Sequence, residues 1–305
     1  MLWLYVIGYR LFFFGKRLRK RFPFWENAAR RYEYLFSVFA NRKMLKWLEK
    51  HPVKWGLNSK PRAEKYTVSL TSFPARIEYV HIAIETLMRQ SVKPDRIVLW
   101  LAESQFPDHK LPETLIALQE KGLTIRYCED LRSHKKYHFS FLEYPEDHII
   151  LADDDLFYPK DTVKRLIKLH KKYPRDIVCM SAQIIGPTML DVPSKWTEAK
   201  PWRKYISHPN AQAFTGAGSL FPAHWYPEEL LNKEKAMEIA PTADDLWLKA
   251  MSLKAGVNTT VDYPPRGFPV DIAIPNNATL FQENKVSGGN QNDRAWRQLV
   301  DYMIL

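Results

Sequence analysis

Between residues 65 and 174, short apolar runs alternate with segments of helical periodicity, and few folds accept that order of elements. Helical crossovers join strands that run parallel to one another. The pattern therefore predicts an α/β fold whose mainly parallel sheet is covered by helices on both faces. The predicted strands span residues 66–70, 96–101, 123–129 and 148–152, and the predicted helices span about 77–88, 111–122 and 159–174.

The second half of the chain is less regular. The stretch "TGAGSLFP" (215–222) has two glycines where the backbone could approach a ligand closely, followed by a strand-like run. A helix is predicted over 241–256, with Pro241 and Thr242 at its start and Gly256 at its end. A strand follows at 257–263. The tail from Pro264 is rich in Asn, Pro and Gly, and ends in a short predicted helix around 293–303.

Three consecutive carboxylates, Asp153, Asp154 and Asp155, follow the apolar run in "HIILADDDLFYPKD" (148–161). In parallel sheets, ligands bind beyond the carboxyl ends of the strands, and these acids stand at such an end. Like charges repel, so we expect a cation between them. Mg²⁺ and Mn²⁺ prefer oxygen ligands and share them with substrate phosphates. The alternative is an acidic turn before the helix that begins near Pro159.

A second acidic pair, Asp244 and Asp245, opens the helix predicted over 241–256. Thr242 and Asp245 have the spacing of a capping box, which is the structural alternative for this pair. A carboxylate at a helix entrance can also face a cleft and accept a proton. The pair is therefore a candidate for the catalytic base.

The basic excess of the chain lies at one end. Residues 1–60 hold fourteen Lys and Arg against three Glu, which accounts for the whole formal charge of +11. The opening apolar stretch is about fourteen residues long, whereas a spanning helix needs roughly twenty. It also lacks the pattern of a secretory signal. We expect residues 1–60 to form a basic, aromatic-rich helical segment on an anionic membrane surface, with an amphipathic helix over 32–50. Packing of this segment onto the main domain is the alternative.

Other classes are disfavoured. No nucleic-acid-binding motif is present, and the basic residues are interleaved with apolar ones, so we expect no nucleic-acid partner. The two cysteines, Cys128 and Cys179, stand alone and predict neither a disulfide framework nor a zinc site. A reducing cytoplasm fits this cysteine usage best.

Five segments together resemble the GT-A glycosyltransferases, in particular the inverting family 2 type. They are "VSLTSFPARI", "KPDRIVLWLAESQFP", "GLTIRYCEDLRSHKKY", "ILADDDLFYPKD" and "PTADDLWLKAM", and they cover roughly residues 66–260. The likeness is greater still to bacterial glycosyltransferases of surface polysaccharides such as capsule, lipopolysaccharide and O-antigen. It implies a Rossmann-like nucleotide-sugar transferase domain over 61–263. The tail 264–305 falls outside the resemblance, and its Gly288 and Gly289 indicate a lid over the acceptor site.

The resemblance assigns roles to particular residues. Asp155, with Asp153, is similar to the ligands of a Mn²⁺ or Mg²⁺ ion, and Asp245 to the catalytic base, with Asp244 as the alternative. Arg132, Lys135 and Lys136 resemble diphosphate-stabilising positions, for which a solvated basic loop is the alternative. Gly216, Ala217, Gly218 and Trp247 are expected at the acceptor, although Trp247 would also suit the core. The remaining expected donor-binding residues are Thr71, Ser72, Phe73, Pro74, Arg76, Glu103, Asp153 and Asp154.

The expected activity is metal-dependent transfer of a hexose from a nucleotide sugar, with UDP as the favoured nucleotide, to a glycan or lipid-linked glycan. A metal neutralises the leaving diphosphate, so one base and no general acid are required. Inversion is expected, although D-x-D occurs in retaining enzymes too. We place the protein in the cytoplasm, peripheral to the inner face of the cell membrane. A D-x-D-dependent phosphatase or hydrolase and a non-catalytic membrane-bound glycan or nucleotide binder are the alternatives.

Overall fold

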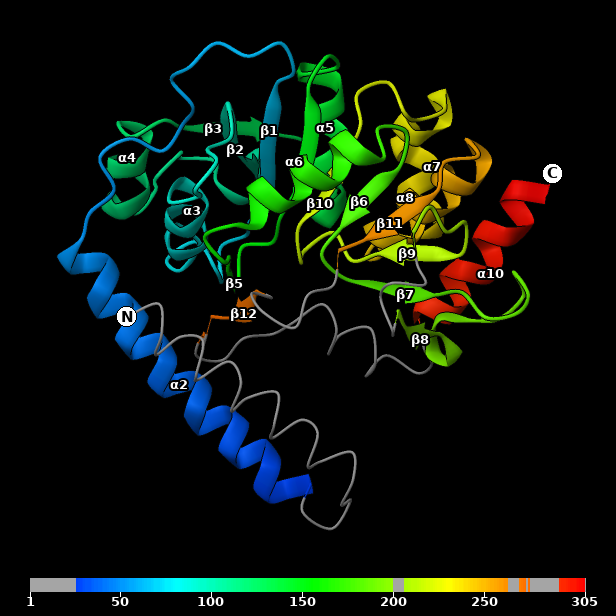
Figure 1. The fold of residues 1–305 in the computed structure, drawn as a ribbon, viewed down its shortest axis with the longest axis horizontal. Coiled ribbons are helices and arrows are strands. Elements are labelled where there is room, and N and C mark those ends of the chain that lie inside the picture. Colours follow the sequence, from blue (N-terminus) through cyan, green and yellow to red (C-terminus); the bar gives the residue numbers. More distant parts are fainter. Residues whose placement is uncertain (1–25, 200–205, 263–268, 273, 275–290, 305) are drawn as a thin grey trace.

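In the computed structural model, residues 26–199, 206–262, 269–272, 274 and 291–304 are described. A seven-stranded sheet forms the centre of the molecule, with strand order β11-β6-β10-β4-β1-β2-β3 (Figure 1). Its strands are β1 (Tyr66–Thr71), β2 (Arg96–Ala102), β3 (Leu123–Cys128), β4 (His148–Leu151), β6 (Ile177–Cys179), β10 (Ser219–Phe221) and β11 (Thr259–Val261).

The sheet is mainly parallel, as the alternation of strands and helices predicts. Strands β4, β1, β2 and β3 pair in parallel, and β11 pairs in parallel with β6. Only β10 is antiparallel to its neighbours β4 and β6 within this sheet. The predicted α/β class is therefore confirmed. Every strand and helix predicted up to residue 172 is present, but the sequence patterns do not predict a helix at 135–143 or a short strand at 156–157.

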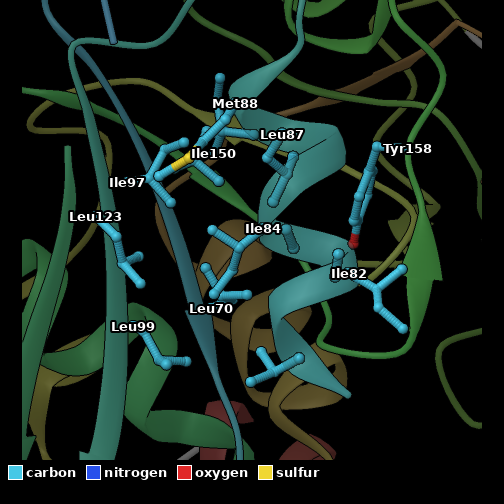
Figure 2. Packing of buried hydrophobic residues seen from close by; sticks show 14 of the residues in the cluster. Leu70, Ile82, Ile84, Leu87, Met88, Ile97, Leu99, Leu123, Ile150 and Tyr158 are labelled. Carbon is cyan, nitrogen blue, oxygen red and sulfur yellow. The ribbon is translucent and has the colours of Figure 1, made fainter. Parts of the chain in front are cut away.

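One face of the sheet is covered by three helices that the sequence predicts. Their apolar side chains pack on alternate strand residues, including Leu70, Leu99 and Ile150. Figure 2 shows Ile84, Leu87 and Met88 directed at these strands. Ile84 is fully buried, so this face is a tightly packed core. The three helices are α3 (Val80–Met88), α4 (Glu113–Gln119) and α6 (Thr162–Lys172).

The opposite face of the sheet is covered by helices that include two from the C-terminal half. Leu299 and Trp296 are fully buried there, so this part of the predicted tail is integrated into the core. Polar residues also lie on this face: Ser140 donates to Ser69 on β1 at 2.8 Å. The helices on this side are α5 (Lys135–Glu143), α8 (Asp244–Lys254) and α10 (Gln291–Ile304), of which α10 packs on α8 and on α7 (Lys233–Ile239).

Smaller elements complete the described fold. A three-stranded antiparallel sheet of order β8-β7-β9 and a two-stranded ladder of β5 and β12 flank the main sheet. The sequence patterns do not predict these strands, because each is only two or three residues long. They are β5 (Leu156–Phe157), β7 (Ala182–Ile184), β8 (Thr197–Glu198), β9 (Ala211–Ala213) and β12 (Val270–Asp271).

The N-terminal helix α2 (Glu26–Lys50) includes the amphipathic helix predicted over 32–50. It runs past the main sheet, and its Glu26 end lies far from the labelled strands (Figure 1). None of the helices in the described part of the chain has the length and apolarity needed to cross a bilayer. The apolar stretch predicted before residue 26, and the central part of the tail interpreted as a lid, lie outside the described residues.

Candidate active site

The three acids of the predicted metal motif lie on the loop between β4 and β5, and two cations contact them. The Nη1 atom of Arg76 is 2.7 Å from Oδ1 of Asp154 and 2.9 Å from Oδ2 of Asp155. On the other side, the Lys136 ammonium donates to Asp153 at 2.7 Å. Asp154 and Asp155 do form a turn, but α6 begins only at Thr162 with Asp161 as its N-cap residue, so the start of that helix does not account for the acids.

These two cations do not fully offset the negative charge of the loop. Burial, followed by the charges of Asp153 and Asp154, raises the pKa of Asp155 to about 7. Burial also raises the pKa of Asp154, against the opposing effect of Arg76. Asp271 on β12 adds a further negative charge near Asp155. Additional positive charge would therefore be stabilised here.

The donor set of the loop fits a hard divalent cation. Asp153 and Asp155 have side chains that are 41% and 24% exposed, whereas that of Asp154 is only 6% exposed. Asp154 is held inside by the Ser72 hydroxyl, which donates to it at 2.6 Å. The two outer carboxylates are thus accessible oxygen ligands of the kind that Mg²⁺ and Mn²⁺ prefer. The middle one anchors the loop to the segment after β1.

The second acidic pair lies in the first turn of α8 and does not form a capping box. The N-cap residue is Ala243 rather than Thr242, and its side chain makes no capping hydrogen bond. Oδ1 of Asp245 instead accepts from the Thr215 hydroxyl at 2.5 Å and from the Thr215 amide at 3.1 Å. The capping-box alternative is therefore wrong, and the Asp245 side chain is held by the loop that precedes β10.

The two acids of this pair are in different environments. Burial followed by the charge of Asp244 raises the pKa of Asp245 to about 7. Burial opposes ionisation of Asp244 as well, but Lys136 and His134 outweigh it and hold the pKa of Asp244 below its usual value. Asp244 is consequently a buried, ionised carboxylate with a positive partner. Asp245 is half-buried, and its pKa lies near neutral pH.

Lys136 connects the two acidic sites. Its ammonium is 2.7 Å from Oδ1 of Asp153 and 3.2 Å from Oδ2 of Asp244, and its side chain is only 4% exposed. Burial disfavours the charged amine, yet Asp153 and Asp244 together raise the pKa of Lys136 above its usual value. The metal motif and the acid pair, ninety residues apart in sequence, are thus neighbours around one buried cation.

Helix α5 presents this lysine, and the sequence patterns do not predict that helix. Ser69 on β1 donates to the carbonyl of Lys136, which fixes the first turn of α5 to the sheet at 2.5 Å. Lys135 is also buried and pairs with Asp130 at 2.6 Å. The alternative of a solvated basic loop is therefore wrong for Lys135 and Lys136. Arg132, in contrast, is exposed.

Tyr158 and Gly216 fit the metal motif closely against the loop before β10. The Tyr158 hydroxyl donates to the Gly216 carbonyl at 2.6 Å and accepts from the Asp153 amide at 2.7 Å. A Cβ atom on Gly216 would lie 1.8 Å from Oδ2 of Asp153, so only glycine fits there. The sequence predicts close approach of a ligand at this glycine; in the structure the side chain of Asp153 lies against it.

The other predicted donor-binding residues follow β1 and β2, which are neighbouring parallel strands. Ser72 and Arg76 contact the metal motif directly, and Arg76 lies over the Phe73 ring at 5.4 Å. Thr71 instead donates to the carbonyl of Trp100 on β2. Glu103, just after β2, is 57% exposed and contacts His109 at 2.7 Å. Pro74 is exposed on the same loop as Ser72.

Trp247 does not lie at the acceptor side of the site. Its side chain is fully buried, and the indole N–H donates to the Leu230 carbonyl at 3.0 Å. The prediction of a cleft-lining Trp247 is wrong, because its position on α8 faces the core. Gly218, with φ of +99°, and the buried Ala217 remain beside Gly216 in the loop before β10.

Three residues outside the predicted set complete this region. Thr215 holds Asp245, Tyr158 holds the Asp153 backbone, and Ile272 after β12 donates its amide to the Asp155 carbonyl at 2.7 Å. Thr215 and Tyr158 lie next to predicted motifs, so their proximity in sequence is a usable signal. Ile272 carries no such signal, because its contact depends on the pairing of β12 with β5.

No protein-family description matches the chain, and no curated protein matches it in sequence. Among solved structures, S. aureus TarS 1–349 has 14% identity and a TM-score of 0.42 over 67% of this chain. The chain spans 59% of that TarS structure. The mannosyltransferase PcManGT from Pyrobaculum calidifontis, in complex with GDP-Man and Mn²⁺, has 14% identity and a TM-score of 0.44, covering 88% of this chain and 77% of its own.

Proposed function

We propose that this chain is a metal-dependent glycosyltransferase that moves a sugar from a nucleotide-sugar donor to a glycan or lipid-linked glycan. The observation that carries the proposal is the position of Lys136 between Asp153 and Asp244. It supports a single reaction centre in which an oxygen-rich metal motif lies opposite an acid pair. The metal motif is suited to binding a diphosphate through its ion, and the acid pair is suited to accepting a proton.

Asp153 and Asp155 would hold a Mn²⁺ or Mg²⁺ ion. When bound, such an ion neutralises the charge that develops on a leaving diphosphate. The protein residues around it keep the two carboxylates in place: Arg76 and Ser72 hold Asp154 between them. Arg132 is an exposed cation on the loop before α5, where it could meet a phosphate. Ser72 to Arg76 and Glu103 are the donor-side residues of this proposal.

Asp245 is the proposed base, in preference to its neighbour Asp244. Thr215 occupies Oδ1 of Asp245, which leaves Oδ2 to accept the proton of an acceptor hydroxyl. A pKa of about 7 suits a base that works near neutral pH. Asp244 is buried against Lys136 and would act by holding that lysine rather than by taking a proton. One base without a general acid is consistent with an inverting displacement.

The motif resemblance supports the finer parts of the proposal. It favours a hexose, a UDP donor and a role in bacterial surface-polysaccharide synthesis. A lipid-linked acceptor at the inner face of the cell membrane would account for the basic excess of residues 1–60. Gly216, Ala217 and Gly218 are the proposed acceptor-side residues.

A thermal-shift screen of UDP- and GDP-sugars with and without Mn²⁺ tests the donor half of the proposal. We expect stabilisation by one class of donor only when the metal is present. Asp155→Asn should abolish that shift, whereas Asp108→Asn, on an exposed loop, should preserve it. A shift that is indifferent to chelator would contradict a metal-bound donor and favour a non-catalytic nucleotide binder.

Release of nucleoside diphosphate with and without glycan acceptors tests the transfer half. The proposal expects release that depends on an acceptor and is lost in Asp245→Asn while donor binding remains. Hydrolysis of simple phosphate esters without any acceptor would instead favour the phosphatase alternative. Chirality of the product's anomeric carbon, read by NMR, decides between inversion and retention.

A further inference from the structure

Helix α2 has one face that is packed against the body. Asn41 and Leu48 are buried, and Met44, Leu45 and Trp47 pack against the apolar core of α3 and α4. These positions recur at helical spacing, so they form one stripe along the C-terminal half of α2. The stripe includes a hydrogen bond from the Asn41 side chain to the Asp271 carbonyl at 3.2 Å.

The opposite face of α2 is exposed and is not polar throughout. Leu35 and Phe39 are 58% and 59% exposed, among the largest exposures of apolar side chains in the described chain. Arg42 and Lys46 continue the same face at intervals of three and four residues, and both are exposed. We name Leu35, Phe39, Arg42 and Lys46 the outward stripe.

Positive charge surrounds the outward stripe. Lys43 and Lys50 are exposed beside it, and the Lys43 ammonium is 5.6 Å from the centre of the Phe39 ring. Among the exposed residues described between 42 and 50, Glu49 is the single acid. An aliphatic and an aromatic side chain followed by four cations complement a surface that is apolar below and anionic above.

We propose that the outward stripe docks on an anionic lipid surface, with Leu35 and Phe39 inserted among the lipids and Arg42 and Lys46 at the phosphates. This proposal names the residues that would contact the membrane. It rests on the proposed function in one respect: a lipid-linked acceptor is the reason for the protein to bind a membrane. Lipid binding itself needs no sugar transfer. A protein partner or a second copy of the chain would use the apolar residues but would not require anionic lipid.

The docked helix is also connected to the metal motif. Asp271, whose carbonyl Asn41 contacts, belongs to β12, and β12 pairs with β5 immediately after Asp155. The next residue, Ile272, donates its amide to the Asp155 carbonyl at 2.7 Å. Figure 1 shows β12 between α2 and the main sheet. The buried face of α2, through Asn41, therefore holds this helix at a fixed position beside the loop that carries Asp155.

Vesicle sedimentation of the full chain tests the docking. We expect binding to vesicles of phosphatidylcholine with phosphatidylglycerol, little binding to phosphatidylcholine alone, and weakening by salt. Leu35→Glu/Phe39→Glu and Arg42→Glu/Lys46→Glu should each reduce binding about tenfold or more. The matched control for charge is Lys164→Glu/Lys168→Glu, which reverses two exposed lysines four residues apart on α6. The apolar control is Ile116→Glu/Leu142→Glu, at residues that are 49% and 53% exposed.

A local probe makes the test specific to the outward stripe. An environment-sensitive fluorophore on Phe39→Cys, in a Cys128→Ser background, should shift to the blue with anionic vesicles, whereas the same label on Ile116→Cys should not. Unchanged binding in both α2 variants, or no shift at position 39, would overturn the proposal. So would loss of a dimer, measured by light scattering without lipid, in Leu35→Glu/Phe39→Glu.

Failure of the docking can be told apart from failure of the proposed function. Metal-dependent donor binding in solution, measured by thermal shift, reports on the acidic loop alone. Variants of the outward stripe should retain that shift while losing vesicle binding. If the protein binds vesicles but nucleotide sugars with metal do not raise its melting temperature, the docking proposal stands and the glycosyltransferase proposal is refuted.

Discussion

The two acidic sites of this protein are alike in sequence and different in their surroundings. Both consist of adjacent aspartates beside a secondary-structure element, and each contains one member with a pKa of about 7. At the loop after β4, Arg76 contacts Asp154 and Asp155, and the side chains of Asp153 and Asp155 stay partly exposed. At the start of α8, the Thr215 hydroxyl contacts both acids, and Lys136 pairs with Asp244.

The difference teaches how similar residues acquire separate tasks. The three carboxylates after β4 have two cations, Arg76 and Lys136, as partners, so this loop keeps an excess of negative charge that suits a divalent ion. A pair in which Lys136 keeps Asp244 ionised leaves Asp245 next to a fixed negative charge, and this raises its proton affinity. The same lysine contributes to both environments, so the two sites are not independent.

The largest expected effects come from replacing one acid at each of the two sites. Asp245→Asn should lower the rate of transfer by about 10²–10⁴-fold with donor binding unchanged, because it removes only the base. Asp155→Asn should remove metal-dependent donor binding itself. Steady-state kinetics and thermal shift with Mn²⁺ separate the two results. Equal effects of both variants on donor binding would break the division of tasks.

Removal of the shared cation should cost stability as well as activity. Lys136→Met leaves Asp244 buried without its main counter-charge, so we expect a loss of about 3–5 kcal/mol in the free energy of unfolding. Lys135→Met is the matched control on the same helix turn, where the partner Asp130 is 30% exposed and can be solvated. Urea denaturation measures both. A smaller loss in Lys136→Met than in Lys135→Met would show that Lys136 is not the connection between the sites.

A smaller effect is expected at the hydroxyl that joins the two loops. Tyr158→Phe removes the acceptor of the Asp153 amide and the donor to Gly216, and should cost about 1–3 kcal/mol. The apparent affinity for Mn²⁺ should fall because the Asp153 backbone is no longer held. Tyr226→Phe, at a half-buried tyrosine in another cluster, serves as the control. Unaltered metal affinity in Tyr158→Phe would remove that residue from the site.

The mildest test uses pH. The folded-state pKa of Asp245 is raised from 3.8 to about 7, so this carboxyl favours folding below pH 4 and loses that contribution as the pH rises towards 7. Asp245→Asn should therefore melt a few degrees higher than the parent chain above pH 7, with the gain shrinking towards pH 4. The rate of transfer should rise with pH up to about 7 as the base ionises. A difference in melting temperature between Asp245→Asn and the parent chain that does not change with pH would contradict a raised pKa of Asp245.

Sequence reasoning succeeded where local pattern and tertiary environment agree. Strands β2 and β4 are nearly continuous apolar runs because both faces of a parallel sheet are buried, and that composition is visible without a structure. Helix α6 shows the same agreement between a strong apolar face and its burial. Asp153 to Asp155 could be singled out because three adjacent charges after such a strand are costly without a partner.

It failed where residues work against their usual preference. Helix α5 begins with Lys135 and Lys136, both buried, and is preceded by Arg132 at φ of +49°, so neither composition nor a capping signal predicts a helix. The alternatives for Trp247 and for the Thr242 capping box could not be resolved in advance, since both are reasonable local structures. Each was decided by what packs around α8.

From the sequence alone came the α/β order, the two groups of aspartates and the basic end of the chain, since each is expressed in the period or charge of neighbouring residues. The tertiary structure alone decided that the two groups surround Lys136, that Asp245 rather than Asp244 is only partly buried, and that α2 turns Leu35 and Phe39 outward. Those facts depend on contacts between residues that lie 17 to 230 positions apart in the sequence. Periodicity and charge describe which side of an element is apolar, but not which distant side chain will offset a buried charge.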